Sequence, residues 1–218
     1  MNLKDLKNNE KLNAHIQKAD DMLKTIGYTE HSFQHVNIVS NNASKILKEL
    51  NYSKKEIELA SIAGYMHDIG NLINRHNHAA NGALLAYTFL INNTDFKIED
   101  IIDITTAIGH HDEGTAYPVN PITAALIIAD KCDVRRNRVR NKMGNENIHY
   151  RVNFSVKESE FIVDKNKRTI ELKLTIDTSI CSVMDYFEIF LERTKLCIES
   201  AKTLESTFIL NINGHILT

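Results

Sequence analysis

The adjacent pair His67-Asp68 constrains the fold of this chain more than any other feature, because it directly follows the apolar residues 62–66. Neighbouring residues on a helix point about 100° apart, so amphipathicity does not account for both polar side chains. Burying an imidazole and a carboxylate is costly unless a partner satisfies them. A divalent metal ion would satisfy both at once. The fold therefore has to bring further ligands to this point.

A chain of 218 residues is long enough for one domain with a full core, or for one domain with a small appendage. Its net charge of -2 argues against a protein that coats DNA, which would be clearly basic. The three cysteines lack metal-type spacing and indicate reduced thiols. The chain starts without the apolar core of a signal peptide, and no apolar run approaches the roughly 20 residues of a membrane-spanning helix. We therefore expect a soluble cytoplasmic protein with no membrane partner.

Residues up to about 145 have the apolar spacing of helices with one buried face. In the first clear helix, this face carries Ile38, Val39, Ala43, Ile46, Leu47 and Leu50. Another helix is predicted over residues 54–66, with Ser53 as its N-cap and Glu56 as the capping-box partner. Three more are predicted over residues 79–91, 98–109 and 121–140.

The apolar period changes near residue 150. Alternation over 152–156 and 170–176, around a polar turn at 164–167, predicts a β-hairpin or a small meander. A helix over about 180–204 and a strand over 208–212 follow. We therefore expect a mainly α protein of two parts, a helical metal-binding domain over residues 1–145 and a β-β-α-β appendage over residues 146–218.

Further imidazoles and carboxylates lie beside apolar helical faces in the first part, at His35, His78, His110, His111 and Asp130. A lone histidine of this kind is more often a hydrogen-bonded structural residue. With His67 and Asp68, however, seven such groups fall within about a hundred residues, which indicates a metal site. Mixed imidazole and carboxylate ligands suit iron, manganese, zinc, nickel or cobalt, and also allow magnesium.

In this order of residues, the sequence resembles the HD-domain metal-dependent phosphohydrolase superfamily, whose fold is a helical bundle. The resemblance runs from His35 through His67-Asp68 to Asp130, across about residues 30–140. His78 and the pair His110-His111 are similar to the extra ligands of two-metal members, including HD-GYP phosphodiesterases. Residues 109–118 resemble a shortened form of the segment that gives those enzymes their name.

The resemblance implies a ligand assignment and a reaction. His35, His67, Asp68 and Asp130 would hold one divalent ion, and Asp68 would bridge to a second ion held by His78, His110 and His111. The implied reaction is hydrolysis of a phosphoester or phosphodiester by attack of a metal-bridging hydroxide, with Asp68 as the catalytic residue that positions both ions. The expected substrate is a nucleotide or another small phosphorylated molecule.

Two positions depart from the family pattern. Asn71 stands where many relatives have a lysine, and Arg75 or Lys131 could take over the role of that lysine. Ala116 replaces the glycine of the Gly-Tyr-Pro motif, so cyclic di-GMP is not the expected substrate.

Basic residues near Asp130 are candidates for binding substrate phosphate. Lys131 and Arg135 are four residues apart on the helix expected over 121–140 and would share a face; with Arg75 they form the expected substrate-binding set. A solvated basic face is the alternative. His31 would join the site if the helix that carries His35 had already begun there, and would otherwise be exposed, whereas His149 is expected to be a surface or structural residue.

Two other function classes stay open. HD-fold oxygenases use similar ligands to hold a di-iron centre, and ligand spacing does not separate them from hydrolases. A non-catalytic module, in which metals only stabilise the helices, is the second alternative. The appendage could form a lid, a homodimer contact or a specificity pocket.

Overall fold

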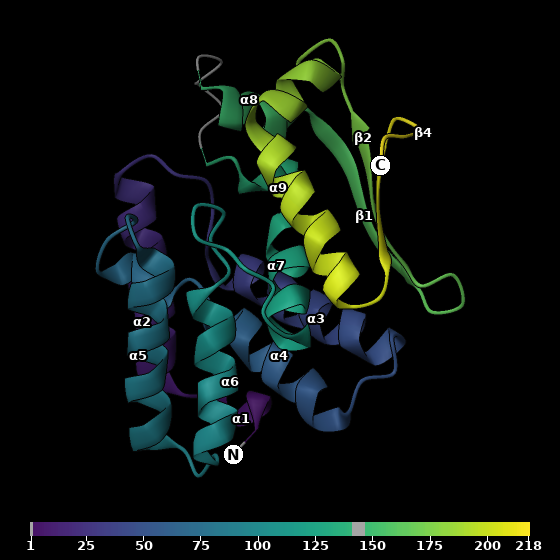
Figure 1. Ribbon diagram of the computed structural model, residues 1–218. Helices are drawn as coiled ribbons and strands as arrows, with labels where there is room; N and C mark the ends of the chain where they lie inside the picture. Colours follow the sequence, from purple (N-terminus) through teal and green to yellow (C-terminus); the bar gives the residue numbers. More distant parts are fainter. Residues whose placement is uncertain (1, 141–146) are drawn as a thin grey trace.

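The computed structural model describes residues 2–140 and 147–218 and shows a helical body with a small C-terminal sheet (Figure 1). This confirms the expected mainly α fold. The helices are α1 (Leu3–Lys7), α2 (Glu10–Thr25), α3 (Phe33–Glu49), α4 (Lys54–Met66), α5 (His78–Asn93), α6 (Ile98–Gly109), α7 (Pro121–Lys131), α8 (Ile148–Ser155) and α9 (Val183–Thr203), with short 3-10 helices η1 (Ile69–Leu72) and η2 (Arg136–Arg138). The strands are β1 (Val156–Asp164), β2 (Thr169–Ile176), β3 (Thr207–Ile212) and β4 (His215–Ile216).

Local sequence signals set several helix ends. The Ser53 side chain accepts a hydrogen bond from the backbone N–H of Glu56, whose carboxylate accepts from the Ser53 N–H, so the predicted capping box of α4 is confirmed. Asn120 caps α7, and Pro121 occupies its first turn, where the missing N–H costs nothing. These caps fix where the chain enters the two helices that lead toward His67-Asp68 and Asp130.

The helices of the body surround one apolar core. α3 packs along α4, α7 packs against both, and α5 pairs with α6 on the outside (Figure 1). Leu47, Ile62 and Leu126, from α3, α4 and α7, are fully buried in this core. The same core continues into the C-terminal segment through Tyr186 and Leu210. Burial of these apolar side chains is the main favourable term that holds the two parts together.

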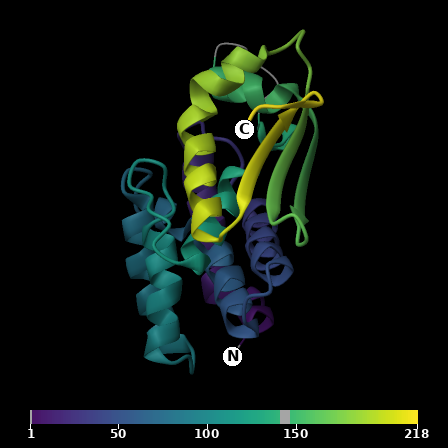
Figure 2. The same ribbon diagram turned by 45° about the vertical axis from the view of Figure 1, so that its right-hand side comes forward.

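The C-terminal sheet has the strand order β1-β2-β3-β4. β1 and β2 form the predicted antiparallel hairpin, β2 and β3 run parallel, and β4 pairs antiparallel with β3. A parallel pair needs a long crossover, which α9 supplies by running back alongside the sheet (Figure 2). α9 also packs against α7, so the C-terminal segment covers the end of the helical body that carries Asp130.

Two predicted elements were wrong. The alternation over 152–156 does not mark a strand, because Asn147 caps helix α8 there and β1 begins at Val156. Three alternating apolar residues are too few to separate a strand from a short helix. The helix predicted over 121–140 ends at Lys131, and the backbone is extended at Arg135. The predicted domain boundary between residues 145 and 146 lies outside the described residues.

Within the described part of the chain, no helix combines the length and apolar character that crossing a bilayer requires.

Candidate metal centre and substrate cavity

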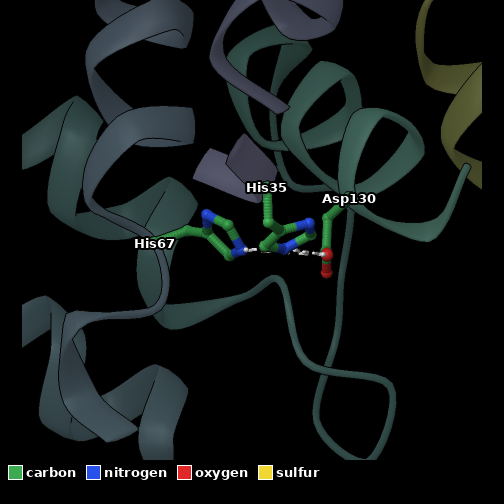
Figure 3. A group of neighbouring side chains, drawn as sticks. All are labelled: His35, His67 and Asp130. Atoms are coloured by element: carbon green, nitrogen blue, oxygen red, sulfur yellow. Dashed lines mark hydrogen bonds and ion pairs between the residues drawn. The ribbon is translucent and has the colours of Figure 1, made fainter. Parts of the chain in front are cut away.

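Two close-packed helices bring His35 and His67 together. A Cβ at Gly64 of α4 would lie only 2.8 Å from the Ser40 Cα of α3, so the two backbones approach as closely as a glycine allows. His35, in the first turn of α3, and His67, just after α4, are both fully buried. Their Nε2 atoms lie 3.2 Å apart and point toward one another (Figure 3).

Asp130 completes a first group of ligands. It lies at the end of α7 and places Oδ1 3.4 Å from the Nε2 of His35 and 3.7 Å from the Nε2 of His67 (Figure 3). One ligand atom from each of these three side chains lies within 4.8 Å of the others. The site thus draws one ligand from each of three helices that are adjacent in the core.

Asp68 lies between this group and a second one. Its Oδ2 is 3.5 Å from the Nε2 of His35 and 3.2 Å from that of His67. Its Oδ1 faces the other way, 3.7 Å from the Nε2 of His78. His67, Asp68 and His111 form the second group with ligand atoms within 4.8 Å of one another. The two oxygens of the Asp68 carboxylate therefore face different imidazoles.

Each of four histidines uses its Nδ1 to donate a hydrogen bond away from the cluster, which leaves the Nε2 lone pair facing inward. Metal-binding histidines typically have this arrangement, since the outer hydrogen bond fixes the tautomer and the ring. The pairs are His35 with Asp133 (2.7 Å), His67 with the Gly64 carbonyl (2.8 Å), His78 with the Arg75 carbonyl (3.2 Å) and His111 with the Ile108 carbonyl (2.6 Å).

These side chains fit a divalent cation. The buried Oδ2 of Asp68 has no hydrogen-bond partner in the described part of the chain, and such an atom is costly unless a cation satisfies it. Two imidazole nitrogens bound to one ion at about 2.1 Å, with ordinary coordination angles, lie roughly 3 Å apart. The separation of 3.2 Å between His35 and His67 agrees with that spacing. Imidazole with carboxylate suits borderline and hard divalent ions.

The charges of the cluster also favour a cation. Burial lowers the pKa of His35, but the nearby carboxylates of Asp130, Asp133 and Asp68 outweigh burial and raise the pKa to about 10. Burial opposes ionisation of Asp68 as well, yet the neighbouring His67 and His35 hold the pKa of Asp68 well below its usual range. Without a metal, a proton on His35 thus supplies the positive charge that the carboxylates require.

A glycine contact places His78. A Cβ on Gly70 would lie 1.9 Å from the His78 carbonyl oxygen and 2.4 Å from the Gly82 nitrogen. The 3-10 helix η1 can therefore pack against the start of α5 only if residue 70 is a glycine. The Nε2 of His78 then lies 3.8 Å from Oδ1 of Asp112, a carboxylate that directly follows His111. Among the described residues, no hydrogen bond or ion pair joins His110 to the other predicted ligands, and its buried Nδ1 has no partner. A ligand role for His110 stays a prediction.

The segment that carries these ligands matches the HD domain family over residues 32–138. Residues 32–138 belong to the HD-domain superfamily. Its members are generally metal-dependent phosphohydrolases that bind divalent ions, and the His/Asp clusters of this HD domain could hold such ions. The narrower similarity to HD-GYP phosphodiesterases stays a prediction.

A curated relative of the chain is the uncharacterized protein MJ1020 of Methanocaldococcus jannaschii. It is 30% identical over 155 residues, covering 61% of this chain and 59% of that protein. The chain thus spans less than two thirds of the length of this relative, whose name assigns no activity.

A cavity of about 430 Å³ opens next to the ligands of the HD domain. Its volume is within the range of small-molecule sites. The lining includes Asp68, His78, Asp112 and Asp130 from the metal centre. The remaining wall carries cations, aromatic rings, an amide and the carboxylate of Glu113; its other residues include Tyr28, His31, Arg75, Lys131, Arg138, His149, Tyr150, Asn153, Phe190 and Arg193.

Arg75 and Lys131 both line this cavity, as the predicted substrate-binding set requires. Asn71, at the position of the family lysine, donates to Oδ1 of Asp68 at 2.9 Å, and its own Oδ1 accepts from Arg75 at 3.3 Å. Asn71 therefore links a predicted bridging ligand to an arginine at the cavity wall. Lys131 donates to Oδ2 of Asp130 at 2.7 Å.

Arg135 is placed differently. The prediction that Lys131 and Arg135 share a helical face was wrong, because α7 ends at Lys131. Arg135 is not among the residues that line the cavity. Its guanidinium donates to Asp133 at 2.5 and 3.0 Å and to Glu30 at 3.2 Å. It therefore supports the carboxylate that holds His35.

Sequence reasoning missed Asp133 and Arg193 as residues of the site, left His31 open and expected His149 outside it. Asp133 follows Asp130 by three residues, about one turn of the helix predicted over 121–140, and this spacing could have suggested it. His31 lies in the loop before α3, where its ring packs 5.2 Å from that of His35, and it lines the cavity. His149, expected on the surface or in a structural role, lines the cavity as well. Arg193 had no local signal, because only the packing of α9 against α7 brings it to the HD domain.

Proposed function

We propose that this protein is a two-metal phosphohydrolase that cleaves a phosphoester of a small phosphorylated molecule. The observation that carries the proposal is the position of Asp68, whose two oxygens face His35 and His67 on one side and His78 on the other. A carboxylate in that position suits a bridge between two divalent ions.

The ligand assignment follows these positions. His35, His67, Asp68 and Asp130 would hold one ion. Asp68, His78 and His111 would hold the second, together with His110 as the family resemblance implies, and Asp112 offers a further carboxylate near His78. When bound, two divalent ions lower the pKa of a water molecule and neutralise phosphate oxygens.

The chain itself would orient the substrate. Arg75 and Lys131 line the cavity beside the metal ligands and would pair with phosphate oxygens. Asn71 donates a hydrogen bond to Asp68 and accepts one from Arg75, so this arginine would take over the role of the family lysine. The buried walls of the site would restrict the access of bulk water to the reacting phosphate.

The size of the cavity favours a small substrate. A volume of about 430 Å³ admits a nucleotide or a sugar phosphate rather than a folded macromolecule. Tyr28, Tyr150 and Phe190 add aromatic surface to the wall, which suits a planar group such as a nucleobase.

The test is phosphate release from a panel of nucleotides and sugar phosphates by protein stripped with chelator and reloaded with manganese, iron, cobalt, zinc or magnesium. We expect turnover that requires the metal and is lost in Asp68→Asn. Metal content is measured in parallel, and Asp103→Asn, a carboxylate of α6 outside the cavity, is the control. Retained metal with no release from any phosphoester would contradict the proposal.

The same experiment separates the two alternative functions. A di-iron oxygenase would require iron and O₂, so the assay is repeated without O₂, where a hydrolase keeps its full rate. A non-catalytic module would bind metal and gain thermal stability from it, but Asp68→Asn would then change the melting temperature and no rate. The cations at the cavity wall favour the hydrolase, because they match a phosphate group.

A further inference from the structure

A carboxylate occupies the position between two cations at the cavity wall. Oε1 of Glu113 accepts a hydrogen bond from Nε of Arg193 at 2.8 Å, and Nζ of Lys131 lies 3.8 Å from the same oxygen. All three residues line the cavity. Two cations that converge on one oxygen define a site for an anionic oxygen atom.

The three side chains come from different parts of the fold. Glu113 belongs to the loop after α6 and is followed by Gly114, whereas Lys131 ends α7 and Arg193 lies in α9. The Glu113 side chain is 30% exposed and belongs to a loop, so its displacement toward solvent would require no shift of a helix. Arg193 is more fixed, because its guanidinium lies 4.1 Å from the centre of the Phe190 ring. The cations are therefore built into helices, and the carboxylate is on a loop.

Charge favours an anion at this position. Arg193 and Lys131 both direct a charged nitrogen at Oε1 of Glu113, one within hydrogen-bond distance and the other within ion-pair distance. Lys131 also lies 2.7 Å from Oδ2 of Asp130, and a metal ion bound by Asp130 would weaken that pairing.

We propose that Lys131 and Arg193 form a second anion subsite, which binds a phosphate adjacent to the one held at the metal centre and which Glu113 fills in the free protein. The proposal rests on the proposed function and deepens it: the substrate class is diphosphate-containing molecules, such as nucleoside diphosphates or triphosphates. Neighbouring phosphates share one bridging oxygen, so the second subsite must lie directly beside the first. Lys131 meets this requirement through its contact with Asp130.

The subsite makes two substitutions act in opposite directions. Glu113→Gln removes the competing carboxylate and should strengthen diphosphate binding about three- to tenfold. Arg193→Gln removes a charged hydrogen-bond donor and should weaken it roughly tenfold or more. Arg193→Lys keeps the positive charge but lacks the planar guanidinium with its paired donors. Its affinity for diphosphate should lie between that of Arg193→Gln and that of the unmodified protein.

The probe is methylenediphosphonate, which resists hydrolysis, with orthophosphate as the single-anion comparison. Binding is measured by calorimetry on chelator-treated and on manganese-loaded protein. Lys195→Gln and Glu192→Gln are matched controls, because this ion pair lies on the exposed side of α9. Both controls should stay within about twofold of the unmodified protein. Urea unfolding of each variant establishes that the compared proteins are folded.

Opposite shifts for Glu113→Gln and Arg193→Gln, larger for methylenediphosphonate than for orthophosphate, support the subsite. Weaker or unchanged binding in Glu113→Gln overturns it, because the Glu113–Arg193 pair would then be structural. An Arg193→Gln variant that binds as the unmodified protein does also overturns it. The chelated arm needs no turnover, so the subsite can stand if the hydrolase proposal fails. Conversely, if the protein hydrolyses monophosphates but the two variants show no such change in affinity, the hydrolase proposal is supported and the subsite proposal is wrong.

Discussion

The Nδ1 of His35 donates a hydrogen bond to Oδ2 of Asp133 at 2.7 Å, and both side chains are buried. Asp133 is held in turn by Arg135, and Arg138 lies 3.7 Å from the same Oδ2. Burial opposes ionisation of Asp133, but His35 and the arginines keep its pKa below its usual range. Its carboxylate therefore stays charged and fixes the orientation of the His35 ring, with Nε2 toward Asp68 and Asp130.

Asp133 should act as a positioning residue for the metal centre. Asp133→Ala leaves the buried imidazole N–H of His35 without its acceptor and removes the carboxylate that pairs with Arg135, so we expect unfolding free energy to fall by about 3–5 kcal/mol. Metal affinity should fall roughly 10–100-fold. Asp133→Asn keeps an acceptor oxygen and should recover part of the affinity. Metal dissociation constants and urea unfolding check both variants; equal metal affinity in all three proteins would remove the positioning role.

Metal binding should strengthen with rising pH. His35 has a pKa of about 10 in the folded, metal-free protein, above the ordinary value of 6.5. Its proton therefore stabilises the metal-free fold below about pH 6.5, and this contribution is lost as pH rises through about 10. A metal ion must displace that proton, so affinity should rise across this window with proton release. Calorimetry in two buffers of different ionisation enthalpy measures the released proton, which should disappear in His35→Gln.

Gly64→Ala should separate α3 from α4. The added Cβ would lie 2.8 Å from the Ser40 Cα, which is backbone and cannot move aside alone. We expect a loss of about 1–3 kcal/mol in unfolding free energy, with weaker metal binding because His35 and His67 move apart. Gly109→Ala is the control: its Cβ would meet Ala83 at 3.6 Å, an ordinary contact, so stability should be unchanged or slightly higher. Urea unfolding with and without metal compares the two.

Arg75 should carry phosphate recognition if the proposed hydrolase function holds. Its guanidinium lies 5.3 Å from the centre of the Tyr28 ring and bonds Asn71. Arg75→Gln should lower kcat/KM by roughly 10–100-fold while metal content stays the same. Arg136→Gln removes an exposed arginine outside the cavity and should leave kcat/KM unchanged. Loss of bound metal in Arg75→Gln would instead assign Arg75 a role in holding His78.

The helices of the body followed from local signals. Residues 54–66 and 98–109 form α4 and α6 with the predicted bounds, because caps and apolar spacing act within one or two turns. The error over 152–156 arose from a pattern of three residues, and the error beyond Lys131 arose because Asp133 and Arg135 bind His35 and Glu30 instead of continuing the helix. These contacts join residues about a hundred positions apart, which no local period reports.

The sequence alone determined the residue types of the metal centre and the helices that carry most of them, since both depend on neighbours along the chain. Only the tertiary structure decided that the Nε2 atoms of His35 and His67 face one another. It also decided that Asp68 lies between these two histidines and His78, and that Arg193 reaches the cavity. These relations depend on how closely α3, α4, α7 and α9 pack. Interhelical distance is set by side-chain volumes, such as the missing Cβ of Gly64, and by burial of a core shared across the whole fold.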